Sequence, residues 1–231
     1  MDIKKYKQVQ KIAKETIEFL KTFINEGLSA KEIKNAAEKF MIKKGINSFW
    51  YYNVGALVFI GKQTTISISG KNYKASNVKV KSEDLVTVDL SPEINGYWGD
   101  FARSFVIQNG KVIKTNQSKS SEINQGIKTE IKLHENFKKI VNEKTSFEEA
   151  YIKLNSLIEE LGFVNLDFNK NLGHSIEKNK NDRIYIKAGN KAKFKNVDLF
   201  TFEPHIKKKG GKYGFKMENI YYFNKGKIEV L

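Results

Sequence analysis

The sequence predicts a single α+β domain over residues 1–231, built as two similar halves that each contain two helices followed by several strands. The length and the 40% hydrophobic content are sufficient for one large core. Two segments far apart in the chain carry the same helix signature, and each is preceded by a second helical pattern and followed by strand-like, aromatic-rich sequence. The two halves are expected to join near residues 108–118.

The first half begins with an amphipathic pattern and continues with a helix whose ends are marked. Ser29 and Glu32 form a capping-box signature, and Gly45 lies where a C-terminal glycine cap is expected. The expected apolar faces are Val9, Ile12, Ile17, Leu20 and Ile24 in the first helix, and Ile33, Ala36, Ala37, Phe40 and Met41 in the second.

The second half repeats this arrangement. Ser146 and Glu149 form the same capping box, and Gly162 follows Ser146 by the same number of residues that separates the corresponding pair in the first half. The matching spacing predicts a structural duplication. The expected apolar faces are Ile123, Ile127, Ile131 and Phe137 in the preceding helix, and Ala150, Tyr151, Leu154, Leu157, Ile158 and Leu161 in the capped one.

Strand-like runs follow each helix pair. In the first half these are the apolar stretch between Gly55 and Gly61, then 85–90 and 101–107. Near the C-terminus, runs at 197–206 and 213–223 flank a Gly-Gly turn and predict a hairpin.

Four carboxylates and one imidazole lie inside or beside these runs. A buried carboxylate is costly unless it is paired or binds a metal ion. Two divalent cations would neutralise four carboxylates, with a neutral imidazole as the nitrogen ligand. The residues therefore predict a two-metal hydrolase site with manganese, iron, cobalt or zinc. The five candidate ligands are Asp89, Asp100, His174, Glu203 and Glu218.

The composition bears on disulfides, membrane segments and nucleic-acid binding. The chain has no cysteine, which excludes disulfides and thiolate metal sites. The N-terminus lacks an apolar signal core and no run reaches membrane-spanning length, so we expect a cytoplasmic protein with no membrane partner. The formal net charge of +15 permits nucleic-acid binding, but the lysines are scattered along the chain and more simply solvate the surface.

Four motifs contain the five candidate ligands. They are 88–104, which holds both aspartates, then Asn-Leu-Gly-His-Ser-Ile at 171–176, Phe-Thr-Phe-Glu-Pro at 200–204 and Gly-Phe-Lys-Met-Glu-Asn at 214–219. In order and context they resemble the motifs of the methionine aminopeptidase, Xaa-Pro aminopeptidase, prolidase and creatinase superfamily. Each motif alone is a weak signal, whereas all of them in order are specific. The resemblance runs from about residue 50 to the end of the chain.

This resemblance implies a pita-bread fold, with two pseudo-symmetric helix-helix-sheet halves around a central metal site. It also implies a role for each residue. Asp89 would chelate one ion, Asp100 and Glu218 would bridge two ions, and His174 and Glu203 would bind the second. Glu203 would in addition exchange protons with a metal-activated water, as a catalytic residue.

The chain departs from the superfamily in its histidines. Peptidases of this type usually carry one substrate-facing histidine upstream of the first aspartate and another shortly after the Gly-His motif. The corresponding stretches here, 66–76 and 177–183, contain none. A missing general acid or base typically costs about 10²–10⁴-fold in rate, so the departure bears on peptide hydrolysis more than on metal binding.

His205 is the candidate replacement for these imidazoles. It lies two residues after Glu203, and strand alternation would place both side chains on one face. We therefore predict a catalytic role for His205. The alternative is an exposed hairpin histidine beside Lys207.

The predicted function is that of a dinuclear-metal-dependent aminopeptidase-type hydrolase, acting on peptide N-termini or Xaa-Pro bonds. The short sequence before the first helix favours a stand-alone catalytic domain like methionine aminopeptidase, whereas Arg103, three residues after Asp100, resembles the Xaa-Pro branch. The alternative is a catalytically impaired pita-bread module that binds protein or nucleic acid, which the missing histidines and the basic charge would suit.

Overall fold

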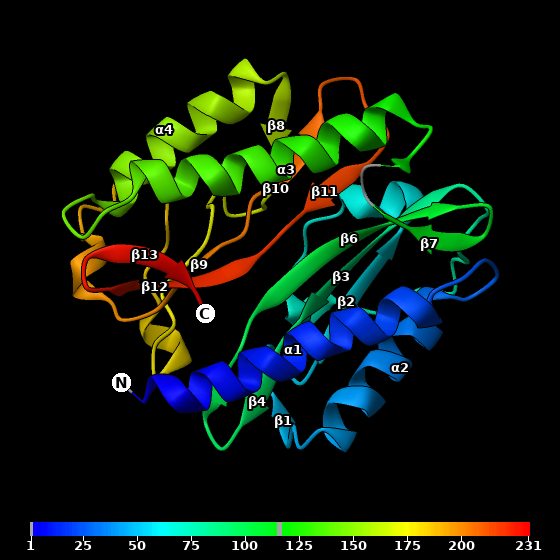
Figure 1. The fold of residues 1–231 in the computed structure, drawn as a ribbon, viewed down its shortest axis with the longest axis horizontal. Helices are drawn as coiled ribbons and strands as arrows, with labels where there is room; N and C mark the ends of the chain where they lie inside the picture. The colour runs from blue at the N-terminus through cyan, green and yellow to red at the C-terminus, as the bar shows by residue number, and fades with distance from the viewer. Residues whose placement is uncertain (1, 115–116) are drawn as a thin grey trace.

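Two helix pairs enclose the strands of the molecule (Figure 1). The computed structural model describes residues 2–114 and 117–231. Helices α1 (Ile3–Phe23) and α2 (Ala30–Lys43) lie on one side of the strands, and α3 (Ser121–Ile140) and α4 (Phe147–Glu160) lie on the other. Mixed helix and sheet confirm the α+β class. The expected junction at 108–118 includes residues 115 and 116, which lie outside the described residues, and the assignment of one domain stays a prediction.

The strands form small antiparallel sheets, whose orders are β2-β3-β6-β7, β1-β4-β5, β11-β10-β8 and β13-β12-β9. The bounds in the first half are β1 (Ser48–Phe49), β2 (Ala56–Ile60), β3 (Asp84–Leu90), β4 (Pro92–Ile94), β5 (Tyr97–Trp98), β6 (Phe101–Gln108) and β7 (Lys111–Ile113). Those in the second half are β8 (Phe163–Asn165), β9 (Phe200–Phe202), β10 (His205–Lys208), β11 (Gly214–Lys216), β12 (Asn219–Asn224) and β13 (Lys227–Val230). Short 3₁₀ helices occur at Gly61–Thr65, Gly70–Asn72, Lys180–Asp182 and Phe194–Asn196.

Both predicted capping boxes are present, and they begin helices of equal length. The Glu32 backbone N–H donates to Ser29 Oγ at 3.2 Å, and the Ser29 N–H donates back to the Glu32 carboxylate at 2.8 Å. Ser146 and Glu149 make the same reciprocal pair, at 3.1 and 2.6 Å. Helices α2 and α4 both have 14 residues. The repeated local chemistry therefore gives a repeated structure.

Each half buries its own apolar core. Helices α1 and α2 pack on β2, β3 and β6, while α3 and α4 pack on the strands of the second half. One predicted core residue is wrong, because Ile131 is 42% exposed. It lies on the outer side of α3, away from the face that Leu133 and Phe137 bury. A third cluster, which includes Trp50, Trp98 and Tyr222, joins elements of both halves.

The two strands predicted near the C-terminus are each divided at a candidate ligand. The run 197–206 breaks between β9 and β10 at Glu203-Pro204, and the run 213–223 breaks between β11 and β12 at Met217-Glu218. Proline has no N–H to donate to a ladder, which accounts for the first break. At the second, the Glu218 N–H turns to the Ala102 carbonyl of β6, 3.0 Å away. The hairpin itself is confirmed, with His205 opposite Lys216.

Candidate metal centre

Adjacent strands of the first half bring the two candidate aspartates together. Asp89 lies near the end of β3, opposite Ala102 of β6, and Asp100 directly precedes β6. The side-chain amide of Gln10 on α1 holds Asp100 at both backbone groups. Its Nε2 donates to the Asp100 carbonyl at 2.8 Å, and its Oε1 accepts from the Asp100 N–H at 3.2 Å. The helix therefore fixes the backbone from which the Asp100 carboxylate projects.

His174 comes from an irregular segment of the second half that is tied to β9. Its N–H donates to Thr201 Oγ1 at 3.0 Å, and Thr201 donates its own N–H to the His174 carbonyl at 2.7 Å. Gly173 has φ 143° and approaches the Thr201 carbonyl so closely that a Cβ would lie 2.4 Å from that oxygen. Glycine is thus required beside the histidine.

The ring of His174 has a defined orientation. Its Nδ1 lies 2.9 Å from the Ser175 carbonyl and so carries the proton it donates there. The lone pair of Nε2 is then free to bind a cation. Nε2 lies 3.4 Å from Asp100 Oδ2 and 3.6 Å from Glu203 Oε1.

Glu218 lies in the gap between β11 and β12 and is fully buried. Its backbone is held on both sides, because its carbonyl accepts from Arg103 Nη1 at 2.6 Å. Neither oxygen of its carboxylate has a hydrogen-bond partner among the described residues. A buried carboxylate left unpaired is costly, so the Glu218 carboxylate indicates a binding position for a cation.

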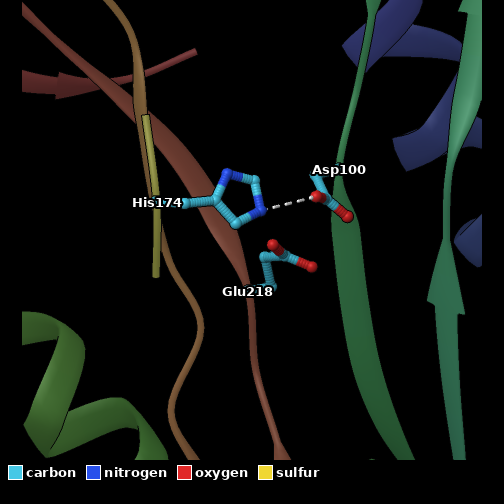
Figure 2. Close-up of side chains that lie close together, drawn as sticks. All are labelled: Asp100, His174 and Glu218. Atoms are coloured by element: carbon cyan, nitrogen blue, oxygen red, sulfur yellow. Dashed lines mark ion pairs between the residues drawn. The ribbon is translucent and has the colours of Figure 1, made fainter. Parts of the chain in front are cut away.

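Asp100, His174 and Glu218 converge on one point. Each offers a ligand atom, and these atoms all lie within 4.8 Å of one another. Figure 2 shows the imidazole and the two carboxylates facing each other, Asp100 from the first half and the other two from the second. Two oxygens and one imidazole nitrogen form a ligand set that suits manganese, iron, cobalt or zinc. The residues present therefore fit a divalent ion.

Asp89 and Glu203 lie beside this group but are joined by a residue that the sequence reasoning did not single out. Lys216 Nζ lies 2.5 Å from Asp89 Oδ2 and 3.0 Å from Glu203 Oε2. A signal for it existed, since Lys216 precedes Glu218 by two residues and alternation on a strand puts such a pair on one face. Gln10 had no comparable signal, because only the packing of α1 brings it to Asp100.

The buried charges shift one another's pKa values. Burial raises the pKa of Asp100 to about 6, the His174 side chain opposes this and Asp89 adds to it. Burial, followed by the negative charge of Asp100, raises the pKa of Glu218 well above its usual range. Burial acts in the same direction on Glu203, but the charge and hydrogen bond of Lys216 together with the charges of His174 and Arg183 outweigh it, and the pKa of Glu203 is lowered. In the protein alone, the region around Glu218 is thus short of positive charge.

The two other histidines lie outside the converging group. His205 is buried and lines the pocket, where its Nε2 lies 2.7 Å from the Thr64 carbonyl. The alternative prediction, an exposed histidine on the hairpin, is therefore wrong. The catalytic role of His205 stays a prediction. Burial lowers the pKa of His205 to about 4, so its imidazole is neutral near pH 7. His134 packs behind the site, with Nδ1 2.7 Å from the Tyr221 hydroxyl and Nε2 3.0 Å from the Met217 carbonyl.

A pocket of about 120 Å³ opens onto these side chains. Asp89, Asp100, His174 and Glu203 line it, and Glu218 lies beneath them. Its wall includes Arg183, which belongs to the stretch 177–183 where the superfamily usually has a substrate-facing histidine. The Arg183 guanidinium lies 4.8 Å from the centre of the Trp50 ring and also lines the pocket. The site therefore combines a carboxylate floor with an aromatic and cationic wall.

Comparison with known proteins identifies the family of this chain. The family model described as metallopeptidase family M24 matches residues 4–225. The chain belongs to this family. Among curated proteins, the chain is similar to methionine aminopeptidase 1 of Bacillus subtilis (strain 168). The two are 34% identical over 98 residues, which is 41% of this chain and 37% of that protein. The alignment thus spans well under half of that relative.

Solved structures show the same fold. X-Pro aminopeptidase from Thermotoga maritima superimposes with a TM-score of 0.81 at 23% identity, covering 99% of this chain and 60% of that one. Methionine aminopeptidase from Rickettsia prowazekii gives 0.79 at 15% identity, covering 99% and 96%. The pita-bread fold predicted from the motifs is therefore confirmed. Among the described residues of this M24 chain, no helix is long and apolar enough to cross a membrane.

Proposed function

We propose that this chain is a divalent-metal-dependent hydrolase of the aminopeptidase type, which acts on peptide N-termini or on Xaa-Pro bonds. The observation that carries the proposal is the convergence of Asp100, His174 and Glu218, with both Glu218 oxygens buried and unpaired. Membership of family M24 supports the same class of chemistry. At saturating metal we expect two ions of manganese, cobalt, iron or zinc, held by these three residues together with Asp89 and Glu203.

Divalent ions in such a centre polarise a carbonyl and make a bound water more acidic. The protein's own groups have separate tasks. Glu203 has a lowered pKa and lines the pocket, so it is ionised at neutral pH and can accept a proton there. His205 also lines the pocket, and its Nε2 donates to the Thr64 carbonyl, which leaves Nδ1 unprotonated. We assign this nitrogen the role of accepting a hydrogen bond from the substrate.

The wall of the pocket favours a short peptide. Trp50, Tyr51 and Phe59 supply apolar surface, and the Arg183 guanidinium supplies a positive charge at the same opening. A peptide that enters with its N-terminal end toward the carboxylates would place its carbonyls or its C-terminal carboxylate near Arg183. This arrangement is compatible with both N-terminal methionine and Xaa-Pro substrates.

The test is reconstitution of chelator-treated protein with one metal at a time, followed by assays of a Met-initiated peptide and an Xaa-Pro dipeptide. We expect metal-dependent release of the N-terminal residue from one of them. Glu218→Gln should abolish this activity, because it removes a ligand that nothing else replaces. Glu159→Gln on the exposed side of α4 is the matched control and should retain it.

Protein that takes up no metal under any of these conditions would contradict the proposal and favour the binding module. Metal uptake without cleavage of either peptide would contradict the substrate class alone.

A further inference from the structure

Asp167 is a further carboxylate of the pocket wall, outside the set of candidate metal ligands. It lies in the loop between β8 and His174, and it lines the same pocket as most of those ligands. Its Oδ1 accepts three hydrogen bonds from the loop itself. The backbone N–H of Asn169 donates at 2.9 Å, and the N–H and Nδ2 of Asn171 both donate at 3.0 Å. One oxygen of this carboxylate therefore holds the loop in shape.

The other oxygen, Oδ2, has no hydrogen bond or ion pair with any group in the described part of the chain. Asp89 and Glu203 differ in this respect, because Lys216 is ion-paired with both of them. Burial raises the pKa of Asp167 and the charge of Glu203 adds to this, against the hydrogen bonds of the loop and the charge of Lys216. The pocket wall thus contains a carboxylate oxygen that has no cation of the chain as a partner.

Two large apolar side chains lie on the wall beside this loop. Phe168, next to Asp167, is 49% exposed, and Ile66 is 41% exposed. Both line the pocket. The Phe168 N–H donates to Ser67 Oγ at 3.1 Å, which ties the Asp167 loop of the second half to the segment of the first half that carries Ile66. Apolar surface and a free carboxylate oxygen are therefore held together at one part of the pocket.

This combination suits a long organic cation better than a metal ion. A metal ion needs several ligand atoms, and among the described residues the converging group of ligands does not include Asp167. A lysine or arginine side chain has an aliphatic stem that packs on apolar surface and a charged end that binds a carboxylate. Ile66 and Phe168 would contact the stem, and Asp167 Oδ2 would accept from the charged end.

We propose that Asp167, with Ile66 and Phe168, is a specificity-determining subsite for a basic side chain of the substrate. The enzyme then prefers peptides that carry lysine or arginine beside the cleaved bond. Arg183, which also lines the pocket, repels such a side chain and directs it toward Asp167. This inference rests on the peptide hydrolysis of the proposed function and names the class of its substrate.

The experiment uses tripeptides with lysine or norleucine in the first or the second position, and the matching pair of dipeptides that end in proline. Norleucine has the stem of lysine without its charge. In the Mn²⁺-loaded wild-type protein, kcat/KM should be about tenfold higher for lysine than for norleucine at one of the two positions, because only lysine forms a charge-assisted hydrogen bond.

Asp167→Asn is the deciding variant. The amide oxygen of asparagine can still accept the three hydrogen bonds of the loop, whereas its NH₂ group cannot pair with an ammonium. The ratio of kcat/KM for lysine over norleucine should therefore fall about tenfold, to near one. Glu160→Gln, at the exposed end of α4, removes the same charge elsewhere and should keep the wild-type ratio. Thermal unfolding shows whether each variant is folded.

Equal cleavage of lysine and norleucine peptides at both positions by the wild type would overturn the inference and leave the proposed function intact. A preference for lysine that persists in folded Asp167→Asn would also overturn it. The wild-type ratio tests the inference even if that variant does not fold.

A protein that cleaves none of these peptides would instead contradict the proposed function. Calorimetric Kd values for the same peptides then test the subsite by themselves. The wild type should bind a lysine peptide about tenfold more tightly than its norleucine counterpart, and Asp167→Asn should bind the two alike. Equal Kd values for the wild type would overturn the inference.

Discussion

Arg103 shows how single side chains prepare the centre without touching a ligand carboxylate. Its guanidinium donates to the backbone carbonyl of Glu218 at 2.6 Å and to the Asn219 side chain at 2.7 Å, and it stacks on Phe101. The Arg103 guanidinium thus binds the segment between β11 and β12 and makes no hydrogen bond to the Glu218 carboxylate, which stays available to a cation. Residues of this kind orient ligands and typically change metal affinity about 10–100-fold when they are removed.

His134 leads to a prediction about stability and pH. Burial lowers its pKa to about 3, compared with about 6.5 in an unfolded chain. The folded state therefore holds the neutral form, and its stabilising contribution is present above pH 6.5 and is lost as the pH falls toward 3. The free energy of unfolding should fall by about 1.4 kcal/mol per pH unit within this range on account of His134 alone.

Urea unfolding of the metal-free protein at pH 7, 6 and 5 measures this dependence. His134→Gln should be less stable than the wild type at pH 7 but less sensitive to acid. An equal slope for the two proteins would show that His134 does not carry the effect.

At the scale of elements, α1 acts on the centre through one residue. Gln10 is buried and makes both of its hydrogen bonds to the backbone of Asp100, whereas its neighbour Gln8 is exposed. The same helix packs on β4, β5 and β6. Helix packing and ligand position are therefore coupled at this point.

Gln10→Leu should loosen the Asp100 backbone, since it leaves a buried N–H and a buried carbonyl unpaired. We expect a loss of about 2–4 kcal/mol in unfolding free energy and about tenfold weaker metal binding. Chemical denaturation and metal titration measure the two effects. Gln8→Leu is the control, and a Gln10→Leu protein with wild-type metal affinity would contradict the coupling.

The helices and strands differ in how far local sequence predicts them. The capping boxes at Ser29 and Ser146 were predicted to the residue, because the reciprocal hydrogen bonds involve groups only three positions apart. The strand ends at Glu203 and Glu218 were not. The break at Glu203 follows from the adjacent Pro204, a local signal that was not applied to the strand bounds. The break at Glu218 depends on a partner distant in sequence, the Ala102 carbonyl that receives the Glu218 N–H.

At the scale of the whole molecule, the centre joins the two halves. Asp89 and Asp100 come from the first half, and His174, Glu203 and Glu218 come from the second. A metal ion bound by both sets can bind tightly only when the halves are in place. Metal binding is therefore linked to the stability of the complete fold.

Saturating Mn²⁺ should raise the melting temperature of the protein, by an amount that corresponds to about 2.7 kcal/mol when the free ion is at a hundred times its Kd. Glu218→Gln should lose this increase while its metal-free form still unfolds cooperatively. Differential scanning calorimetry with and without chelator measures both. A metal-induced increase that persists in Glu218→Gln would contradict the assignment of this residue as a ligand.

The sequence by itself determined the class of fold, the duplicated helix pairs and the identity of five candidate ligands, because capping, apolar periodicity and short motifs are local properties of the chain. Only the tertiary structure decided how those ligands are arranged. The convergence of Asp100, His174 and Glu218, the clamp by Gln10 and the pairing of Lys216 with Asp89 and Glu203 all join residues far apart in sequence. Distances of that kind arise from the packing of the two halves, which no local pattern encodes.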